Sequence, residues 1–213
     1  MSRAETLQQL SRLCRNGRDV AALPVEPSGY AGLDSSLPGG GWPVGTIVEL
    51  MSATTGIGEL RLLLPTLARL THAERHVALI APPYIPFAPA FAQRGVKLER
   101  LVVIEAKTPE DSLWAFEQAL RCKSFGAALA WISIAKDREI RRLQLAAESA
   151  RSIGFLYRSP SAALESSPAA VRLKLRPDEK GLSIDVLKCR GGHGGFTISI
   201  DAQHDAAASS AVG

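Results

Sequence analysis

Two hydrophobic patterns alternate along the chain. Continuous apolar runs, typical of strands that are buried on both faces, occupy residues 46–50, 76–82, 100–106, 127–133 and 155–158. The segments between them carry apolar residues at helical spacing, and residues 108–126 are the best marked, with Thr108 as N-cap and Pro109 at the first helical position. Strands that alternate with helices predict a mostly parallel central sheet covered by helices.

Three further helices are expected from the same spacing, at residues 59–70, 87–95 and 137–154. Pro65 should kink the first of these, because proline has no N–H to donate to the carbonyl one turn earlier. A helix at the N-terminus is indicated by Leu7, Leu10 and Cys14.

The pattern changes near residue 170. Residues 171–176 and 182–188 alternate apolar and polar positions around a turn, and a last strand follows at 196–200. This alternation predicts an antiparallel C-terminal hairpin extension with one face in water. We therefore expect an N-terminal helix and linker arm over residues 1–26, a core domain over 27–201 and a disordered tail over 202–213.

Composition narrows the function classes only slightly. The 213 residues are 46% hydrophobic and 22% charged, with a formal net charge of +4, so contact with an acidic partner is permitted but not required. The three cysteines are far apart and form no CxxC pair, and the N-terminus has no apolar signal-peptide core. The cysteine pattern predicts a reduced, cytoplasmic setting, and because no apolar run reaches membrane-spanning length, no membrane contact is expected.

The stretch "MSATTGIGELRLL" follows an apolar strand and leads into a predicted helix, which is the layout of a phosphate-binding loop. Its candidate residues are Ser52, Thr54, Thr55, Gly56, Ile57, Gly58 and Glu59. The loop has no lysine, and Glu59 would repel a phosphate at the helix N-terminus. No aspartate ends the strand at 127–133, and no acid occurs in "PPYIPF". These absences predict a degenerate P-loop in a protein that is not an enzyme and uses no cofactor or metal.

The order of several stretches resembles a known family. They include "PGGGWPVGTIVEL", "GIGELRLLLPTLARLT", "VALIAPPYIPFAPAF" and "LKCRGG". Together they resemble the ImuA branch of RecA-like proteins, which is also grouped with SulA. The resemblance implies a RecA-like core and a non-catalytic accessory role in SOS-induced translesion DNA synthesis. The implied partners are RecA, ImuB and an error-prone replicative-type polymerase.

Two other functions remain open from the sequence. The first is a SulA-like inhibitor of cell division that binds the filament-forming division GTPase. The second, less favoured, is a protein that retains residual ATP binding. Both alternatives assume the same fold, so they are distinguished only by what the protein binds: the division GTPase or ATP.

Three groups of residues are candidate partner-binding positions. Lys188 and Arg190 lie at the end of the late hairpin, where the resemblance implies contact with a neighbouring subunit; the alternative is two solvated charges. A basic stripe on one helix comprises Arg138, Arg141 and Arg142, although acids are interleaved with it. Tyr84 and Phe87 stand among prolines and either cover the sheet edge or form a protein-binding surface. Since aromatic residues are only 6% of the chain, DNA contact is expected to be weak or indirect.

Overall fold

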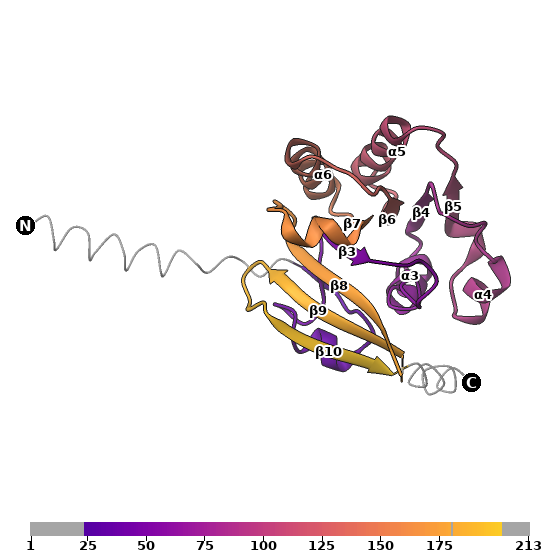
Figure 1. Ribbon diagram of the computed structural model, residues 1–213. Coiled ribbons are helices and arrows are strands. Elements are labelled where there is room, and N and C mark those ends of the chain that lie inside the picture. The colour runs from indigo at the N-terminus through magenta and orange to yellow at the C-terminus, as the bar shows by residue number, and fades with distance from the viewer. Residues whose placement is uncertain (1–23, 180, 202–213) are drawn as a thin grey trace, which may run out of the picture.

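A mixed eight-stranded sheet forms the centre of the computed structural model, which describes residues 24–179 and 181–201 (Figure 1). Its strand order is β10-β9-β8-β3-β7-β6-β4-β5, and the strands from β8 to β5 are parallel. The parallel strands are β3 (Thr46–Ser52), β4 (His76–Ile80), β5 (Leu101–Ile104), β6 (Phe125–Trp131), β7 (Ile153–Arg158) and β8 (Val171–Asp178). The antiparallel extension is β9 (Gly181–Cys189) and β10 (Phe196–Asp201).

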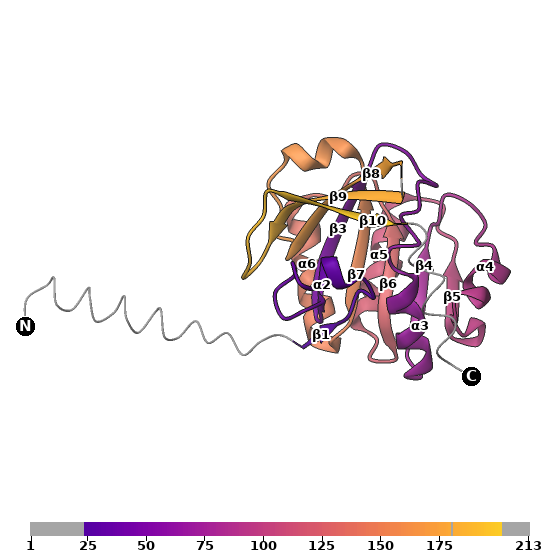
Figure 2. The same ribbon diagram turned by 90° about the horizontal axis from the view of Figure 1, so that it is seen from below.

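Helices cover both faces of the parallel strands. Figures 1 and 2 show α5 and α6 together on one side of the sheet and α3 on the other. The helices are α2 (Ala31–Asp34), α3 (Leu64–His72), α4 (Ala88–Gln93), α5 (Pro109–Arg121) and α6 (Asp137–Ala150), with short 3-10 helices η1 (Leu98–Arg100) and η2 (Pro160–Leu164). A separate two-stranded ribbon pairs β1 (Val25–Glu26) with β2 (Trp42–Pro43).

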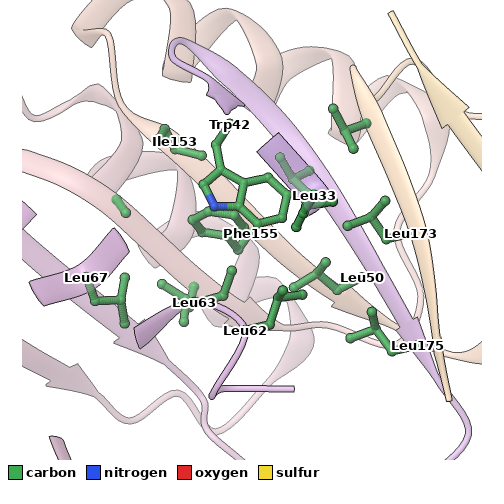
Figure 3. Close-up of a cluster of buried hydrophobic side chains, with 14 of the residues drawn as sticks. Leu33, Trp42, Leu50, Leu62, Leu63, Leu67, Ile153, Phe155, Leu173 and Leu175 are labelled. Carbon is green, nitrogen blue, oxygen red and sulfur yellow. The ribbon is translucent and has the colours of Figure 1, made fainter. Parts of the chain in front are cut away.

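The continuous apolar runs are explained by two hydrophobic cores, one on each face of the sheet. On β3, Ile47 packs with the α5–α6 cluster, whereas Val48 and Leu50 pack with the α3 cluster. In the α3 cluster, shown in Figure 3, the Trp42 ring meets Phe155 edge-on at a centroid distance of 5.4 Å. The Trp42 Nε1 group donates to Thr66 Oγ1 over 3.1 Å, so this buried indole is also satisfied.

The segment after β3 differs from the prediction. Residues 53–63 form bends and turns, and α3 begins only at Leu64, so Glu59 is not at a helix N-terminus. Pro65 occupies the first turn of α3 and produces no kink, because a first-turn residue needs no N–H donor. A P-loop requires the helix to begin directly after the loop. The predicted RecA-like core with a degenerate P-loop is therefore wrong. The structure has instead a mixed sheet in which turns, and not a helix, follow β3.

The predicted N-terminal helix and the tail at 202–213 lie outside the described residues. Within residues 24–179 and 181–201, no helix has the length and apolar character needed to cross a membrane.

Candidate protein-binding site

A hollow of about 320 Å³ lies at the carboxyl ends of the central parallel strands. Its walls come from the loop after β3 (residues 53–63), the loop after β4 (residues 81–87), α4 and the end of β6. We call it the carboxyl-edge hollow. Its lining includes Glu59, Leu60, Leu64, Leu79, Tyr84, Phe87, Phe91 and Trp131. Ligands of parallel α/β sheets bind at this edge, because the loops that leave the strands converge there.

Exposed apolar side chains form the outer rim of the hollow. The loop after β4 presents Tyr84, Ile85 and Phe87 with 70%, 95% and 69% of their surfaces exposed. Pro82, Pro83 and Pro86 in the same loop lack amide donors, so this segment cannot continue as helix or central strand. The Thr55 hydroxyl donates to the Tyr84 hydroxyl over 3.4 Å and links the two loops. Apolar groups exposed together in this way mark an interaction surface.

Glu59 lies in the wall of this hollow and is only 6% exposed. Its Oε1 atom accepts a hydrogen bond from the Gly56 amide over 2.8 Å. Gly56 and Gly58 have φ values of +83° and +98°, which side-chain-bearing residues rarely adopt, and this allows the loop to turn back on the carboxylate. The Oε2 atom has no hydrogen-bond partner among the described residues. The loop thus surrounds a carboxylate of its own at the place where the sequence suggested a phosphate.

Two stacked aromatic rings complete the inner end of this site. Trp131, at the end of β6, lies 4.7 Å from Tyr157 of β7 with the ring planes 8° apart. The Tyr157 hydroxyl donates to the Glu59 carbonyl over 3.3 Å. Burial, and to a smaller extent the charge of Glu59, raises the pKa of Tyr157 well above its usual value. Trp131 Nε1 is buried without a hydrogen-bond partner in the described part of the chain.

A second carboxylate, Glu49, lies on the opposite face of the sheet and is fully paired. Its Oε1 accepts from Arg158 Nη1 over 3.0 Å, and its Oε2 accepts from Arg172 Nε over 2.6 Å. The two arginines also donate to backbone carbonyls: Arg158 to Ala135 O, between β6 and α6, and Arg172 to Ala162 O and Glu165 O, in the segment that follows β7. Glu49 is 0% exposed, so this network is an internal support and not a binding site.

The predicted hairpin residues Lys188 and Arg190 form internal hydrogen bonds to the backbone of the segment before β8. Lys188 Nζ donates to Ser167 O over 2.7 Å, and Arg190 Nη2 donates to Pro168 O over 3.3 Å. Partial burial lowers the pKa of Lys188, and the positive charges of Arg190 and Arg172 lower it further. Both side chains therefore bond to the segment before β8. The sequence had suggested either contact with a neighbouring subunit or two solvated charges, and this internal role was not among those predictions.

The predicted basic stripe lies on α6, across the sheet from the carboxyl-edge hollow. Arg138 and Arg141 are exposed, whereas Arg142 Nε pairs with Glu117 Oε2 of α5 over 2.7 Å. Glu117 also pairs with Arg121, so part of the basic charge joins the two helices. The structure does not bring these arginines near Tyr84 and Phe87.

The structure thus gathers only part of the predicted set. Tyr84, Phe87, Gly56, Gly58 and Glu59 line one hollow, and Ile57 packs beside it on the core. Ser52 Oγ donates to Thr54 O over 2.6 Å within the turn, so this hydroxyl supports the loop itself.

Sequence reasoning missed three residues: Ile85 and Trp131 at the hollow, and Glu49 beneath the sheet. Only Glu49 carried a signal, as a lone acid inside an apolar strand. Among the described residues, no group of three or more His, Cys, Asp or Glu side chains is placed to hold a metal ion.

The fold and the hollow define an α/β protein with a mixed sheet and an apolar surface at the carboxyl edge of that sheet. The sequence model of one family, described as "Cell division inhibitor SulA", matches residues 45–154, just over half of the chain. The chain belongs to the SulA family.

Similar proteins carry the same description. Cell division inhibitor SulA of Photorhabdus laumondii is 24% identical over 115 residues, which are 54% of this chain and 65% of that protein. The Edwardsiella piscicida protein of the same name is 32% identical over 98 residues, 46% of this chain and 58% of that protein. The crystal structure of SulA from Pseudomonas aeruginosa gives a TM-score of 0.45 at 24% identity, covering 53% of this chain and 97% of that chain. The match to the first of these relatives thus spans slightly less than two thirds of its length.

These matches correct the functional prediction. The expected accessory role in translesion DNA synthesis is wrong, because the family model and the curated relatives all describe an inhibitor of cell division. The partners predicted with that role, RecA, ImuB and a polymerase, find no support in them. The alternative from the sequence, a SulA-like inhibitor, agrees with the family.

Proposed function

We propose that this protein inhibits cell division by binding the division GTPase through the carboxyl-edge hollow and its rim. One observation carries the proposal: in a chain of the SulA family, Tyr84, Ile85 and Phe87 are exposed together around an apolar hollow. A protein partner that covers these side chains would remove apolar surface from water, which stabilises a complex by about 25 cal/mol for each Å².

The kind of residue at the rim also favours a protein partner. Aromatic side chains are enriched at the centres of protein interfaces, where they provide a large contact area with few rotatable bonds. The rim loop contains three prolines and is linked to Thr55, which limits the entropy lost when a partner orders it. On α6 the large exposed apolar side chain is Leu145, and beside Lys188 it is Leu187, whereas the rim loop exposes three such side chains close together.

We further propose that the protein acts without catalysis. The loop that would hold a phosphate contains no lysine, and its Gly56 amide is already bonded to Glu59. Calorimetry with Mg-ATP at millimolar concentration should show no binding heat. Saturable binding of Mg-ATP would favour the open alternative of residual ATP binding. A cytoplasmic location and a place in the ImuA branch both stay predictions.

An assembly assay tests the proposed function directly. The purified division GTPase is mixed with the full chain, and polymer formation and GTP turnover are followed. The wild-type protein should suppress both at near-equimolar ratio, and Ile85→Ser should do so only weakly. Because Ile85 is 95% exposed, this substitution removes an interface contact without removing core packing. Unchanged polymer and turnover with a several-fold excess of wild-type protein would overturn the proposal.

A further inference from the structure

We propose that the interface with the division GTPase extends beyond the hollow, over a second exposed apolar patch at the same edge of the sheet. The patch consists of Ile134, in the loop after β6, and Leu164, in η2 after β7, and we call it the β6–β7 patch. The inference rests on the proposed function, because it assigns a further contact surface to the same partner. One member of the patch, Leu164, lies beyond residues 45–154, which the family model matches.

Both side chains of the patch are accessible to a partner. Ile134 has 78% and Leu164 has 93% of its surface exposed, so neither has to leave the core to make a contact. Single exposed apolar residues are common on protein surfaces, and one alone would need no explanation. These two residues differ from such cases because they lie close together, in loops that buried arginines hold in place.

One guanidinium group joins the two loops. Arg158 Nη2 donates to the Ala135 carbonyl over 3.0 Å and to Glu165 Oε2 over 3.0 Å, so both acceptors meet at the same nitrogen atom. Ala135 directly follows Ile134, and Glu165 directly follows Leu164. Both residues of the patch therefore lie beside this junction, although 30 positions separate them in sequence.

Further hydrogen bonds fix the backbone of η2 around the exposed leucine. Arg172 donates to the carbonyls of Ala162 and Glu165, which flank Leu164 on its two sides. Arg172 is itself buried and paired with Glu49 inside the sheet. Because this segment is held in place before a partner binds, little conformational entropy is lost when Leu164 enters an interface.

The patch and the hollow belong to one surface. Strands β7, β6 and β4 are consecutive in the sheet and parallel, so the loops that follow them leave from the same edge. Neighbouring strands are about 4.8 Å apart, so the ends of β7 and β4 are separated by only about 10 Å. Trp131, the last residue of β6, lines the hollow, and the loop that carries Ile134 begins directly after it. Figure 2 shows η2, the short orange helix, at the same end of the sheet as the loop after β3.

A protein fits this surface better than a nucleic acid does. Nucleic acids bind through basic side chains that reach the phosphates from the surface. The two arginines of this region are instead buried, with side chains 2% and 8% exposed, and both are bonded to acceptors of the chain itself. A protein interface of ordinary size buries about 800 Å² on each partner, which is large enough to cover the rim and the β6–β7 patch together.

The test compares the dissociation constants of the purified division GTPase for four full-length proteins: wild type, Ile134→Ser/Leu164→Ser, Ile85→Ser and Leu145→Ser. All the substituted residues are at least 65% exposed, so the substitutions leave the core intact. We expect the patch double variant to weaken binding about 10-fold or more, because two apolar contacts leave the interface. Leu145 is the matched control, since it is exposed about two turns into α6 and away from this edge, and Leu145→Ser should change the affinity less than about 2-fold.

The outcomes separate this inference from the proposed function. If Ile85→Ser weakens binding and the patch double variant binds as the wild type does, the inference is overturned and the proposed function stands. Absence of wild-type binding overturns both. Equal weakening by Leu145→Ser and by the patch double variant also overturns the inference, because the effect would not be specific to this edge.

Two further measurements complete the test. Circular dichroism and thermal melting establish that each variant is folded. If the double variant melts below the wild type, Leu164→Ser alone takes its place, and a weakening of at least about 3-fold is expected, whereas unchanged binding overturns the inference. Light scattering that shows a wild-type dimer dissolved by the patch variant would assign the patch to a second copy of this chain, and would also overturn the inference.

Discussion

Two buried glutamates, ten positions apart in sequence, have opposite environments. Glu49 lies inside the sheet with both carboxylate oxygens bonded to arginines. Glu59 lies at the carboxyl edge with one oxygen bonded to its own loop and the other without a partner among the described residues. Two adjacent residues of β7 contact the two glutamates. Arg158 donates to the Glu49 carboxylate, and the Tyr157 hydroxyl donates to the backbone carbonyl of Glu59.

The difference distinguishes a carboxylate with both oxygens bonded from one with an oxygen that has no partner in the described chain. A fully paired buried charge is complete, and removing one member leaves the others uncompensated. A half-paired buried charge contributes less to the folded state, because one oxygen has lost its water without gaining a donor. Glu49 should therefore contribute more to stability than Glu59.

The largest expected effect on stability is at Glu49. Glu49→Gln removes the carboxylate charge that pairs with Arg172, whose side chain is 8% exposed, and leaves Arg158, 2% exposed, paired with Glu165 alone. The free energy of unfolding should fall by about 3–5 kcal/mol, the cost of leaving a buried charge unpaired. Urea denaturation followed by circular dichroism measures it. A loss below about 1 kcal/mol would show that the network is not a structural support.

A smaller effect is expected at Tyr157, which links β7 to the loop after β3. Tyr157→Phe removes the hydrogen bond to Glu59 O and should lower the free energy of unfolding by about 0.5–1.5 kcal/mol at neutral pH. The measurement is again urea denaturation, and Tyr84→Phe, which removes a 70% exposed phenol, is the matched control.

The same residue predicts a pH dependence. The pKa of Tyr157 is raised in the folded protein, so above the unfolded-state pKa of about 10 the unfolded chain loses a proton that the folded chain retains. The stability that Tyr157 contributes is thus full below about pH 10 and decreases as the pH rises further. Tyr157→Phe should flatten this decrease, as measured by urea denaturation between pH 8 and pH 11. An equally steep decrease in the variant would contradict the assignment.

The smallest effect on stability is expected at Glu59. Glu59→Gln retains the bond from Gly56 and replaces an oxygen that has no hydrogen-bond partner in the described chain, so the free energy of unfolding should change by less than about 1 kcal/mol. Thermal melting at pH 7 measures it beside Glu49→Gln. A loss as large as that of Glu49→Gln would abolish the distinction between the two glutamates.

Local pattern was sufficient for most of the fold but not for the site. The apolar runs located β3 to β7, because burial on both faces leaves few polar positions, and the changed pattern after residue 170 located β8, β9 and β10. The helix after β3 was predicted too early, since Leu60, Leu63 and Leu64 have helical spacing although residues 53–63 form turns. The pairing of Glu49 involves residues 109 and 123 positions away, and no local pattern shows that they meet.

The candidate site was only partly visible for the same reason. Tyr84 and Phe87 were marked by the prolines around them, and Glu59 by its place in a glycine-containing loop. The sequence marked Trp131 only as the end of a strand. Its place in the hollow and the burial of its Nε1 depend on the pairing of β6 with β7, which brings it beside Tyr157.

The central claim is that the carboxyl edge, and not a basic surface, binds the division GTPase. Its most direct test is the affinity of the purified GTPase for two double variants, Ile85→Ser/Phe87→Ser and Arg138→Ala/Arg141→Ala, both of which change exposed side chains. We predict that the first weakens binding at least about 10-fold and that the second changes it less than about 2-fold. Strong loss with the arginine variant and unchanged binding with the rim variant would contradict the account.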